Sequence, residues 1–239
     1  LSRRGAITPL SDGRLLCVDA EGLAVSEDDG HTWPDTVPAA LGQNPAAQPA
    51  SCYVLETAPG RMVMVYLDCL ADDRQFAWDS AAGEPADNCR LHLCAARSRD
   101  GGHTWADRQV LLDGYNANFF GFIRTATGRL LVAAEHLLTR PGRWASCSLV
   151  SDDDGLTWRR SNLIDLGGHG HHDGATEPTL VELSDGRVWM LIRTNLGFFW
   201  QATSDDGGRY FRQISPAKLH ARIAPRHLVR LSGGRLVLV

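Results

Sequence analysis

Short hydrophobic runs alternate with turn residues along the whole chain. Thr179–Leu183 and Met190–Ile192 are typical runs, and Gly, Asp and Ser cluster between such runs. Hydrophobic runs of roughly four to eight residues that are bounded by turn residues indicate β-strands. No run approaches the roughly 18 uninterrupted apolar residues of a membrane-spanning helix. The pattern therefore predicts an all-β chain and excludes a membrane span in this segment.

One eight-residue pattern, S-x-D-x-G-x-T-W, recurs along the chain. Copies begin at Ser26, Ser98 and Ser151, and a degenerate copy begins at Ser204, with spacings of 72, 53 and 53 residues. The Asp carboxylate can accept backbone N–H bonds inside its own loop, the Gly provides a positive φ, and the final aromatic packs between strands. The pattern predicts β-hairpin turns of the Asp-box type. Calcium binding is disfavoured because the loops lack the later ligands and the terminal Glu of an EF-hand.

A second repeated element is a Gly-Arg turn followed by a hydrophobic strand. Each unit reads, in order, as strand A, Gly-Arg turn, strand B, loop, strand C, Asp-box turn and strand D. This is the four-stranded antiparallel meander of a β-propeller blade. The chain holds four full units and the opening hairpin of a fifth. The turns are Gly13-Arg14, Gly60-Arg61, Gly128-Arg129, Gly186-Arg187 and Gly234-Arg235.

The meander order predicts which connections lie together. The A–B turns and the Asp-boxes share one face, while the B–C and D–A connections share the other face, vary in length and can carry a site. The predicted B–C loops are 19–22, 67–93, 134–146 and 193–199, and the predicted D–A connections are 34–50, 106–118, 159–177 and 212–225.

The hairpin from Glu177 to Arg193 carries the most informative residues on that variable face. Glu177 begins strand A of the fourth unit and Arg193 ends strand B. Because the ends of an antiparallel hairpin meet, we expect the two side chains to lie side by side and face the central channel. The pair can be a functional constellation or a structural ion pair across the hairpin mouth.

Together with the Asp-boxes, the sequence E-P-T-L-V-E-L-S-D-G-R that starts at Glu177, and the later Arg193, resemble the sialidase (neuraminidase) superfamily. The resemblance implies a six-bladed β-propeller, of which about four and a half blades are present here. It also implies that Glu177 is the base partner of a catalytic tyrosine and that Arg193 is one of three arginines that clamp a substrate carboxylate. The tyrosine and the third arginine would follow Val239.

The resemblance implies further site residues nearer the start of the chain. Arg3 or Arg4 occupies the place of the first arginine of the clamp, although the usual R-I-P is absent. Asp19 is the candidate acid/base aspartate in a short B–C loop. Its rivals in the long loop of the second unit are Asp68, Asp72 and Asp73.

Several other polar residues are expected at the variable face. Asp173 can be a general acid or a rim contact, can join His169, His171 and His172 in a metal site, which we disfavour, or can simply belong to a Gly-hinged loop. Glu135 and His136 are expected to end strand B of the third unit at the position equivalent to Arg193. The candidate substrate contacts are Glu135, His136, His172, Tyr115 and Asn118.

Composition narrows the possible partners only slightly. The 239 residues are 44% hydrophobic and 22% charged, with a net charge of −4, which disfavours nucleic-acid binding through a broad basic face. Among the six cysteines, buried free thiols are favoured, and a Cys69–Cys89 disulfide is the alternative if the protein is secreted.

These observations predict a single sialidase-like propeller domain over residues 1–239, incomplete at its C-terminus because the chain stops inside a hydrophobic strand. The expected function is a sialidase-like exo-glycosidase that removes a terminal acidic sugar from a glycan with retention and needs no cofactor or metal. The alternatives are a non-catalytic glycan-binding propeller and a protein-interaction scaffold. We expect a monomer, and the resemblance implies a secreted or periplasmic location.

Overall fold

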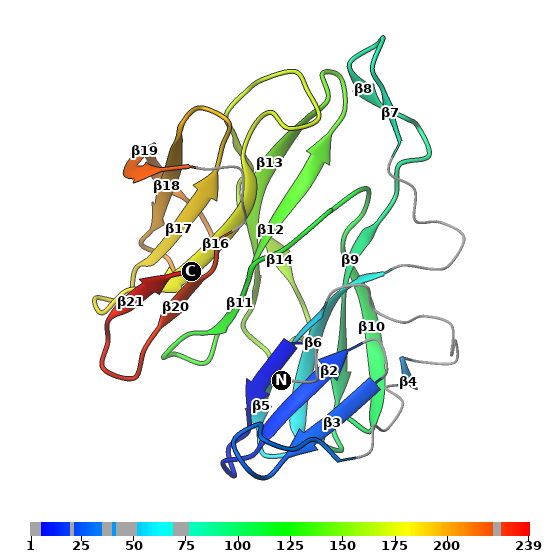
Figure 1. Ribbon diagram of the computed structural model, residues 1–239, viewed down its shortest axis with the longest axis vertical. Helices are drawn as coiled ribbons and strands as arrows, with labels where there is room; N and C mark the ends of the chain where they lie inside the picture. The colour runs from blue at the N-terminus through cyan, green and yellow to red at the C-terminus, as the bar shows by residue number, and fades with distance from the viewer. Residues whose placement is uncertain (1–5, 20–21, 35–39, 42–51, 69–76, 222–225) are drawn as a thin grey trace. The chain divides into compact units, whose positions relative to one another are not determined.

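A computed structural model describes residues 6–19, 22–34, 40–41, 52–68, 77–221 and 226–239. All regular secondary structure in these ranges is β-strand (Figure 1). The chain divides into two compact units. The first comprises residues 1–74, 91–113 and 154–156, and the second comprises residues 75–90, 114–153 and 157–239.

The first unit holds two sheets. One is a three-stranded meander, and the other has the order β4-β10-β9-β6-β5. Inward-facing side chains such as Leu16, Met64 and Trp105 form one hydrophobic core between them. The strands are β1 (Ala6–Pro9), β2 (Leu15–Asp19), β3 (Gly22–Ser26), β4 (Ala40–Leu41), β5 (Cys52–Ala58), β6 (Arg61–Asp68), β9 (His92–Ser98) and β10 (Thr104–Leu112).

The second unit holds two further meanders and two short hairpins, β7-β8 and β20-β21. Its cores include Leu131, Leu180, Met190 and Phe199. The strands are β7 (Trp78–Asp79), β8 (Glu84–Pro85), β11 (Gly121–Arg124), β12 (Leu130–Leu138), β13 (Arg143–Ser151), β14 (Arg159–Arg160), β15 (Ile164–Asp165), β16 (Thr176–Glu182), β17 (Val188–Arg193), β18 (Phe198–Ser204), β19 (Arg212–His220), β20 (Leu228–Arg230) and β21 (Leu236–Leu238). The predicted all-β architecture, three of the four predicted four-stranded meanders and the hairpin after them are confirmed, whereas the first sheet has three strands in the described residues.

The Asp-box turns use the hydrogen bonds that their sequence predicts. Asp28 Oδ1 accepts the backbone N–H of Thr32 at 2.8 Å, and Ser26 Oγ accepts the N–H of Gly30 at 2.9 Å. The Thr32 hydroxyl and N–H lower the pKa of Asp28 to about 2. The final aromatic is not always core, contrary to prediction: Trp105 and Phe211 are buried, but Trp33 and Trp158 are only half-buried.

Three predicted connections are shorter than expected. Strand β10 continues to Leu112 and β19 covers Arg212–His220, so much of the predicted connections 106–118 and 212–225 is strand. The strand pair β12-β13 continues to the pairing of Leu138 with Arg143, so the loop spans residues 139–142 rather than 134–146. Glu135 and His136 therefore lie inside β12 and do not end it. Adjacent strand residues point to opposite faces, so the two side chains cannot both face the same mouth as predicted.

Five cysteines lie in the described part of the chain, and all five are free thiols: Cys17, Cys52, Cys89, Cys94 and Cys147. Cys69 lies outside the described residues, so the alternative Cys69–Cys89 disulfide stays untested.

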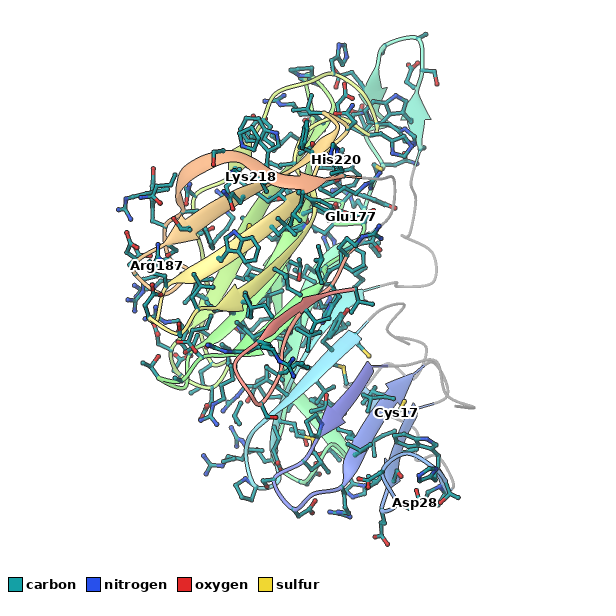
Figure 2. The ribbon with its side chains drawn as sticks, turned by 60° about the vertical axis from the view of Figure 1, so that its left-hand side comes forward. Cys17, Asp28, Glu177, Arg187, Lys218 and His220 are labelled. Carbon is teal, nitrogen blue, oxygen red and sulfur yellow. The ribbon has the colours of Figure 1, made fainter. Side chains whose placement is uncertain are left out.

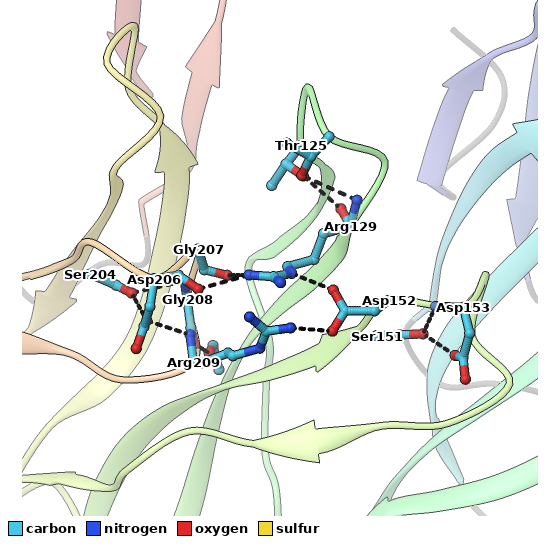
Figure 3. A network of polar contacts seen from close by, with 12 residues as sticks. Thr125, Arg129, Ser151, Asp152, Asp153, Ser204, Asp206, Gly207, Gly208 and Arg209 are labelled. Carbon is cyan, nitrogen blue, oxygen red and sulfur yellow. Dashed lines mark hydrogen bonds and ion pairs between the residues drawn. The ribbon is translucent and has the colours of Figure 1, made fainter.

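A Gly-Arg turn also ties two sheets of the second unit together. Arg129 Nη1 donates to the carbonyls of Asp206 and Gly207 at 2.8 and 2.9 Å, and its Nε donates to Asp152 at 2.6 Å. Asp152 accepts a second bond from Arg209 at 2.7 Å (Figure 3). The turn arginine of one meander thus caps the Asp-box of the following one.

We expect Arg129→Ala to lower the free energy of unfolding by about 1–2 kcal/mol, because two carbonyls and the Asp152 carboxylate lose their donor. Urea denaturation checks this value. Arg187→Ala is the matched control: among the described residues its guanidinium pairs only with Asp185 in the same exposed turn, and we expect a change below about 0.5 kcal/mol. Equal losses in the two variants would contradict the tie between the sheets.

Candidate active site

A pocket of about 210 Å³ opens in the second unit. Its walls come from the segment before β11, from β12 and β13, from the loop before β16 and from the β16-β17 hairpin. The lining residues are Tyr115, Ala117, Asn118, Glu135, Trp144, His171, His172, Thr176, Glu177 and Arg193.

Glu177 and Arg193 form an ion pair in this pocket, as the hairpin geometry predicts. Arg193 Nη1 lies 2.8 Å from Glu177 Oε1, and the side chains are only 13% and 14% exposed. Figure 2 labels Glu177 near the start of β16. The ladder pairs Thr176 with Arg193 and then shifts register before Thr179, and this irregularity places Glu177 beside Arg193.

Two atoms of the pair are left without a partner. Glu177 Oε2 and Arg193 Nε are buried and have no hydrogen bond among the described residues. Buried polar atoms are nearly always satisfied, so a lone acceptor and a lone donor within one ion pair are exceptional. Each of these atoms can still form one hydrogen bond, Oε2 as an acceptor and Nε as a donor.

Glu135 lies beneath the pair and holds the backbone of Glu177. Its Oε2 accepts the N–H of Glu177 at 2.7 Å, and its side chain is almost fully buried. Glu177 has a φ of 45°, a conformation that costs energy in a residue with a Cβ. Burial, together with the nearby Glu177 charge, raises the pKa of Glu135 to about 8. A neutral Glu135 avoids placing a second negative charge under Glu177.

Aromatic and imidazole rings form one wall of the pocket. The ring centroids of His171 and His172 are 3.8 Å apart, and Trp144 donates its Nε1–H to the carbonyl of His171 at 2.8 Å. Burial, with help from the His171 and Arg193 charges, lowers the pKa of His172. Tyr115 packs against Trp144 with centroids 6.0 Å apart. The wall is apolar enough to cover the face of a sugar ring.

The structure brings some of the sequence candidates together and leaves others apart. Tyr115, Asn118, Glu135 and His172 line the pocket with the ion pair. His136 is not among the lining residues, and its Nδ1 lies 2.9 Å from Asn116 Oδ1.

Asp173 does not line the pocket either. It accepts the N–H of His169 at 3.0 Å and a short hydrogen bond from the Asn195 amide. Its carboxylate is therefore engaged in ordering its own loop and the turn after β17.

The candidates nearer the N-terminus are either not among the residues that line this pocket or lie outside the described chain. Asp68 is buried in the first unit, where it pairs with Arg108. The residues outside the described part are Arg3, Arg4, Asp72 and Asp73, and the side chain of Asp19 is not described.

Trp144 was predicted to lie in the loop 134–146 of the variable face and was given no role, whereas it lies in β13. In the observed register Glu135 pairs with Ser146, and Trp144 lies two residues before Ser146 on the same face. The alternation of the strand would have placed Trp144 beside Glu135 if β12 had been extended to Leu138.

No group of three or more His, Cys, Asp and Glu side chains in the described ranges is arranged to hold a metal ion. Among those same residues, no helix is long and apolar enough to cross a membrane.

Comparison with known proteins identifies the fold and the family. A sialidase of Micromonospora viridifaciens is 28% identical over an alignment of 228 residues that covers 85% of this chain and 33% of that protein. The chain thus spans about a third of the length of this relative.

Two solved structures share the fold. A Dyadobacter fermentans protein of unknown function matches with a TM-score of 0.69 and 20% identity, over 98% of this chain and 73% of that one. The NanB sialidase of Streptococcus pneumoniae, as its K499G mutant, matches with a TM-score of 0.61 and 14% identity, over 99% and 56%. These neighbours confirm the sialidase-type β-propeller. The BNR repeat-like domain family matches residues 76–239, and the chain belongs to this family.

Proposed function

We propose that the pocket of the second unit binds the terminal acidic sugar of a glycan and forms part of the catalytic site of a retaining, sialidase-like exo-glycosidase. One observation carries the proposal: the ion pair of Glu177 and Arg193 faces a pocket with one buried acceptor and one buried donor left over. A purely structural ion pair would satisfy these atoms within the protein. The sialidase relative supports the same reading.

Arg193 is suited to the carboxylate of the sugar. Its Nη1 is bound to Glu177, and Nε has no hydrogen-bond partner among the described residues, so the guanidinium keeps donors for an anion. A guanidinium binds a carboxylate through parallel N–H donors and cannot lose its charge at neutral pH. The ring wall of Tyr115, Trp144 and His172 would cover the sugar while its carboxylate is held.

Glu177 is suited to accept a proton from a hydroxyl nucleophile. Oε1 is fixed by Arg193, and Oε2 is the free acceptor. In the proposed reaction the oxygen of a tyrosine, supplied by another part of the protein, bonds to the anomeric carbon as the bond to the leaving group breaks. Glu177 takes the phenolic proton, and water then releases the sugar with overall retention.

The stereochemistry of hydrolysis tests this proposal. The full-length protein is mixed with an α-sialoside, and ¹H NMR follows the first anomer of sialic acid that appears. We expect the α anomer first, followed by slow conversion to the β anomer. The β anomer as first product would contradict the retaining mechanism.

A missing hydrolytic activity would contradict the catalytic proposal as a whole. Glycan binding that depends on Arg193 would then favour the non-catalytic glycan-binding alternative. A protein without either property would favour the interaction scaffold.

A further inference from the structure

A second pocket lies in the first unit, among the Gly-Arg turn of β5-β6, the Asp-box turn after β9 and residues 154–156. Its volume is about 290 Å³. Three of its lining residues are arginines, Arg61, Arg97 and Arg99, and its other lining residues are Thr57, Met62, Ser98, Asp154 and Leu156. Nothing in the proposed function uses this pocket.

The turn arginine has an acidic partner in each of the other three meanders. Arg14 pairs with Asp12 at 2.7 Å and Arg187 with Asp185 at 2.8 Å, in each case with the acid two residues earlier in the same turn. Arg129 has Thr127 at that place, and pairs instead with Asp152 across the hairpin (Figure 3). Each of these arginines is therefore neutralised by an acid at one of two positions. One is two residues earlier in the same turn, and the other is across the hairpin.

In the β5-β6 meander neither of these two positions holds an acid. The residue two before Arg61 is Pro59. The register pairs Met62 with Ser98, so the residue across from Arg61 is Arg99. The equivalent register in the β11–β14 meander pairs Leu130 with Ser151 and places Asp152 across from Arg129. A cation thus faces a cation where the other meanders have Glu27, Asp152 and Asp205.

Two carbonyls of the neighbouring Asp-box turn already accept hydrogen bonds from other side chains. Arg97 Nε donates to the Asp154 carbonyl at 2.9 Å, and the Gln109 side chain donates to the Gly155 carbonyl at 2.9 Å. In the β18-β19 Asp-box, Arg129 itself caps the carbonyl of Gly207, which corresponds to Asp154, and the carbonyl of Asp206 one residue earlier. Arg61 has no hydrogen bond or ion pair from its guanidinium in the described part of the chain, so its donors are available.

Two acids reduce the positive charge but do not cancel it. Asp107 lies 3.2 Å from Arg97 and 3.4 Å from Arg99, and Asp154 lines the pocket. Three arginines against two aspartates leave one positive charge. Like charges across a strand pair repel each other, and a bound anion relieves that repulsion.

The pocket also offers an apolar surface. Leu156 is half-exposed at an Asp-box position where the other copies carry His31, His103 and Arg209. The buried Met62 also lines the pocket. A water molecule occupies about 30 Å³, so a small inorganic ion would leave most of the pocket to solvent. A ligand with one oxyanion and an organic body fits the pocket better.

We propose that this pocket is a second binding site, which takes a sugar-sized ligand bearing a single oxyanion, a sulfate or a carboxylate, between Arg61 and Arg99. The anion accepts N–H bonds from both guanidinium groups, and the body of the ligand covers Leu156. The site is independent of the Glu177–Arg193 pocket and of the proposed hydrolysis.

Calorimetric titration of the full-length protein tests the site with four probes. These are glucose 6-sulfate, methyl β-glucuronide, uncharged methyl β-glucoside and inorganic sulfate. We expect at least one of the two charged sugars to bind. The one that binds with the higher affinity shows whether the site prefers a sulfate or a carboxylate. We expect methyl β-glucoside not to bind, and inorganic sulfate to bind at least about tenfold more weakly than the charged sugar. Sulfate that binds as tightly as the charged sugars would mean an adventitious ion only and would overturn the proposal.

The variants are chosen to separate binding from folding. Arg61→Ala and Arg99→Asp should each weaken binding by about tenfold or more, and the second recreates the acid found across from Arg129. Asp107→Asn should tighten binding by about threefold, since it removes the competing carboxylate, and Asn tolerates the φ of 56° at that position. A gain of affinity cannot result from unfolding.

Two controls locate the binding. Arg14→Ala removes a turn arginine that Asp12 already neutralises, and Arg193→Ala disables the other pocket, so both should leave the affinity unchanged. Loss of binding in Arg193→Ala would overturn the proposal, as would unchanged binding in Arg61→Ala and Arg99→Asp.

Discussion

Replacing Glu177 by Gln is expected to lower kcat/KM for an α-sialoside by roughly 10³-fold, with most of the loss in kcat. The amide keeps the shape of the side chain and can still accept the hydrogen bond of Arg193 at Oε1. The amide cannot accept a proton, so the side chain can no longer act as a base at the position of Oε2. Steady-state hydrolysis of a fluorogenic sialoside by the full-length protein measures the effect.

Arg193→Lys is the informative companion to that variant. Lys keeps the positive charge beside Glu177 but has no second guanidinium N–H to replace Nε, so we expect a rise in KM of about tenfold or more. Arg187→Ala, in an exposed turn, is the matched control and should retain parental kinetics. Kinetics within about twofold of the parent in Glu177→Gln would contradict a role for this carboxylate in proton transfer.

Glu135→Ala is expected to have the largest effect on folding, a loss of about 3 kcal/mol in the free energy of unfolding. The truncation removes the acceptor of the Glu177 N–H and leaves a cavity at an almost fully buried position. It also releases the backbone conformation of Glu177, whose φ is 45°. Urea denaturation near pH 5 measures the loss while Glu135 of the parent is protonated.

Glu135→Gln separates the hydrogen bond from the charge. Because the pKa of Glu135 is raised from 4.5 to about 8 in the folded protein, the unfolded chain releases this proton first. The stability contributed by Glu135 is therefore fully present below about pH 4.5 and is lost as the pH rises towards 8. Gln mimics the protonated acid at every pH, so the variant should lose less stability than the parent over that range.

A stability difference between parent and Glu135→Gln that does not change from pH 5 to pH 8 would contradict a neutral Glu135. An exposed acid provides the control: Glu27 lies in an Asp-box turn, and Glu27→Gln should leave the slope of stability against pH unchanged over this range.

Repeats made most of the fold predictable from the sequence. The Asp-box octet specifies its own turn through short-range hydrogen bonds, so Asp28, Asp100 and Asp153 adopt the same geometry wherever the octet occurs. The Glu177–Arg193 contact was predictable for a related reason, since a hairpin of known turn brings its two ends together. Local chemistry and antiparallel pairing together placed this part of the site.

The remaining parts of the pocket depend on contacts that no local pattern encodes. Glu135 reaches Glu177 from a different sheet, and only packing of the sheets brings its carboxylate under that backbone N–H. The end of β12 was placed too early because the polar Glu135 and His136 were taken as the strand end, although the strand continues to Leu138 and turns only at residues 139–142, which include Pro141 and Gly142. That misplaced boundary put Trp144 in a loop rather than in β13 and put His136 in the wrong environment.

The pocket around Arg61 could not be predicted from the sequence. The Gly-Arg turns look alike in the sequence, and the differences become meaningful only when the strand register shows which residue faces each arginine. Pro59 and Arg99 are unremarkable one at a time. Placed on either side of Arg61, they remove both acids that neutralise the other turn arginines.

A crystal structure of the full-length protein with bound sialic acid tests the central claim most directly. We predict that the sugar occupies the pocket of the second unit, with a carboxylate oxygen within about 3 Å of an Arg193 nitrogen. Its ring should pack against the wall formed by Tyr115, Trp144 and His172. Sialic acid bound elsewhere, with the Glu177–Arg193 pocket unoccupied, would contradict the claim.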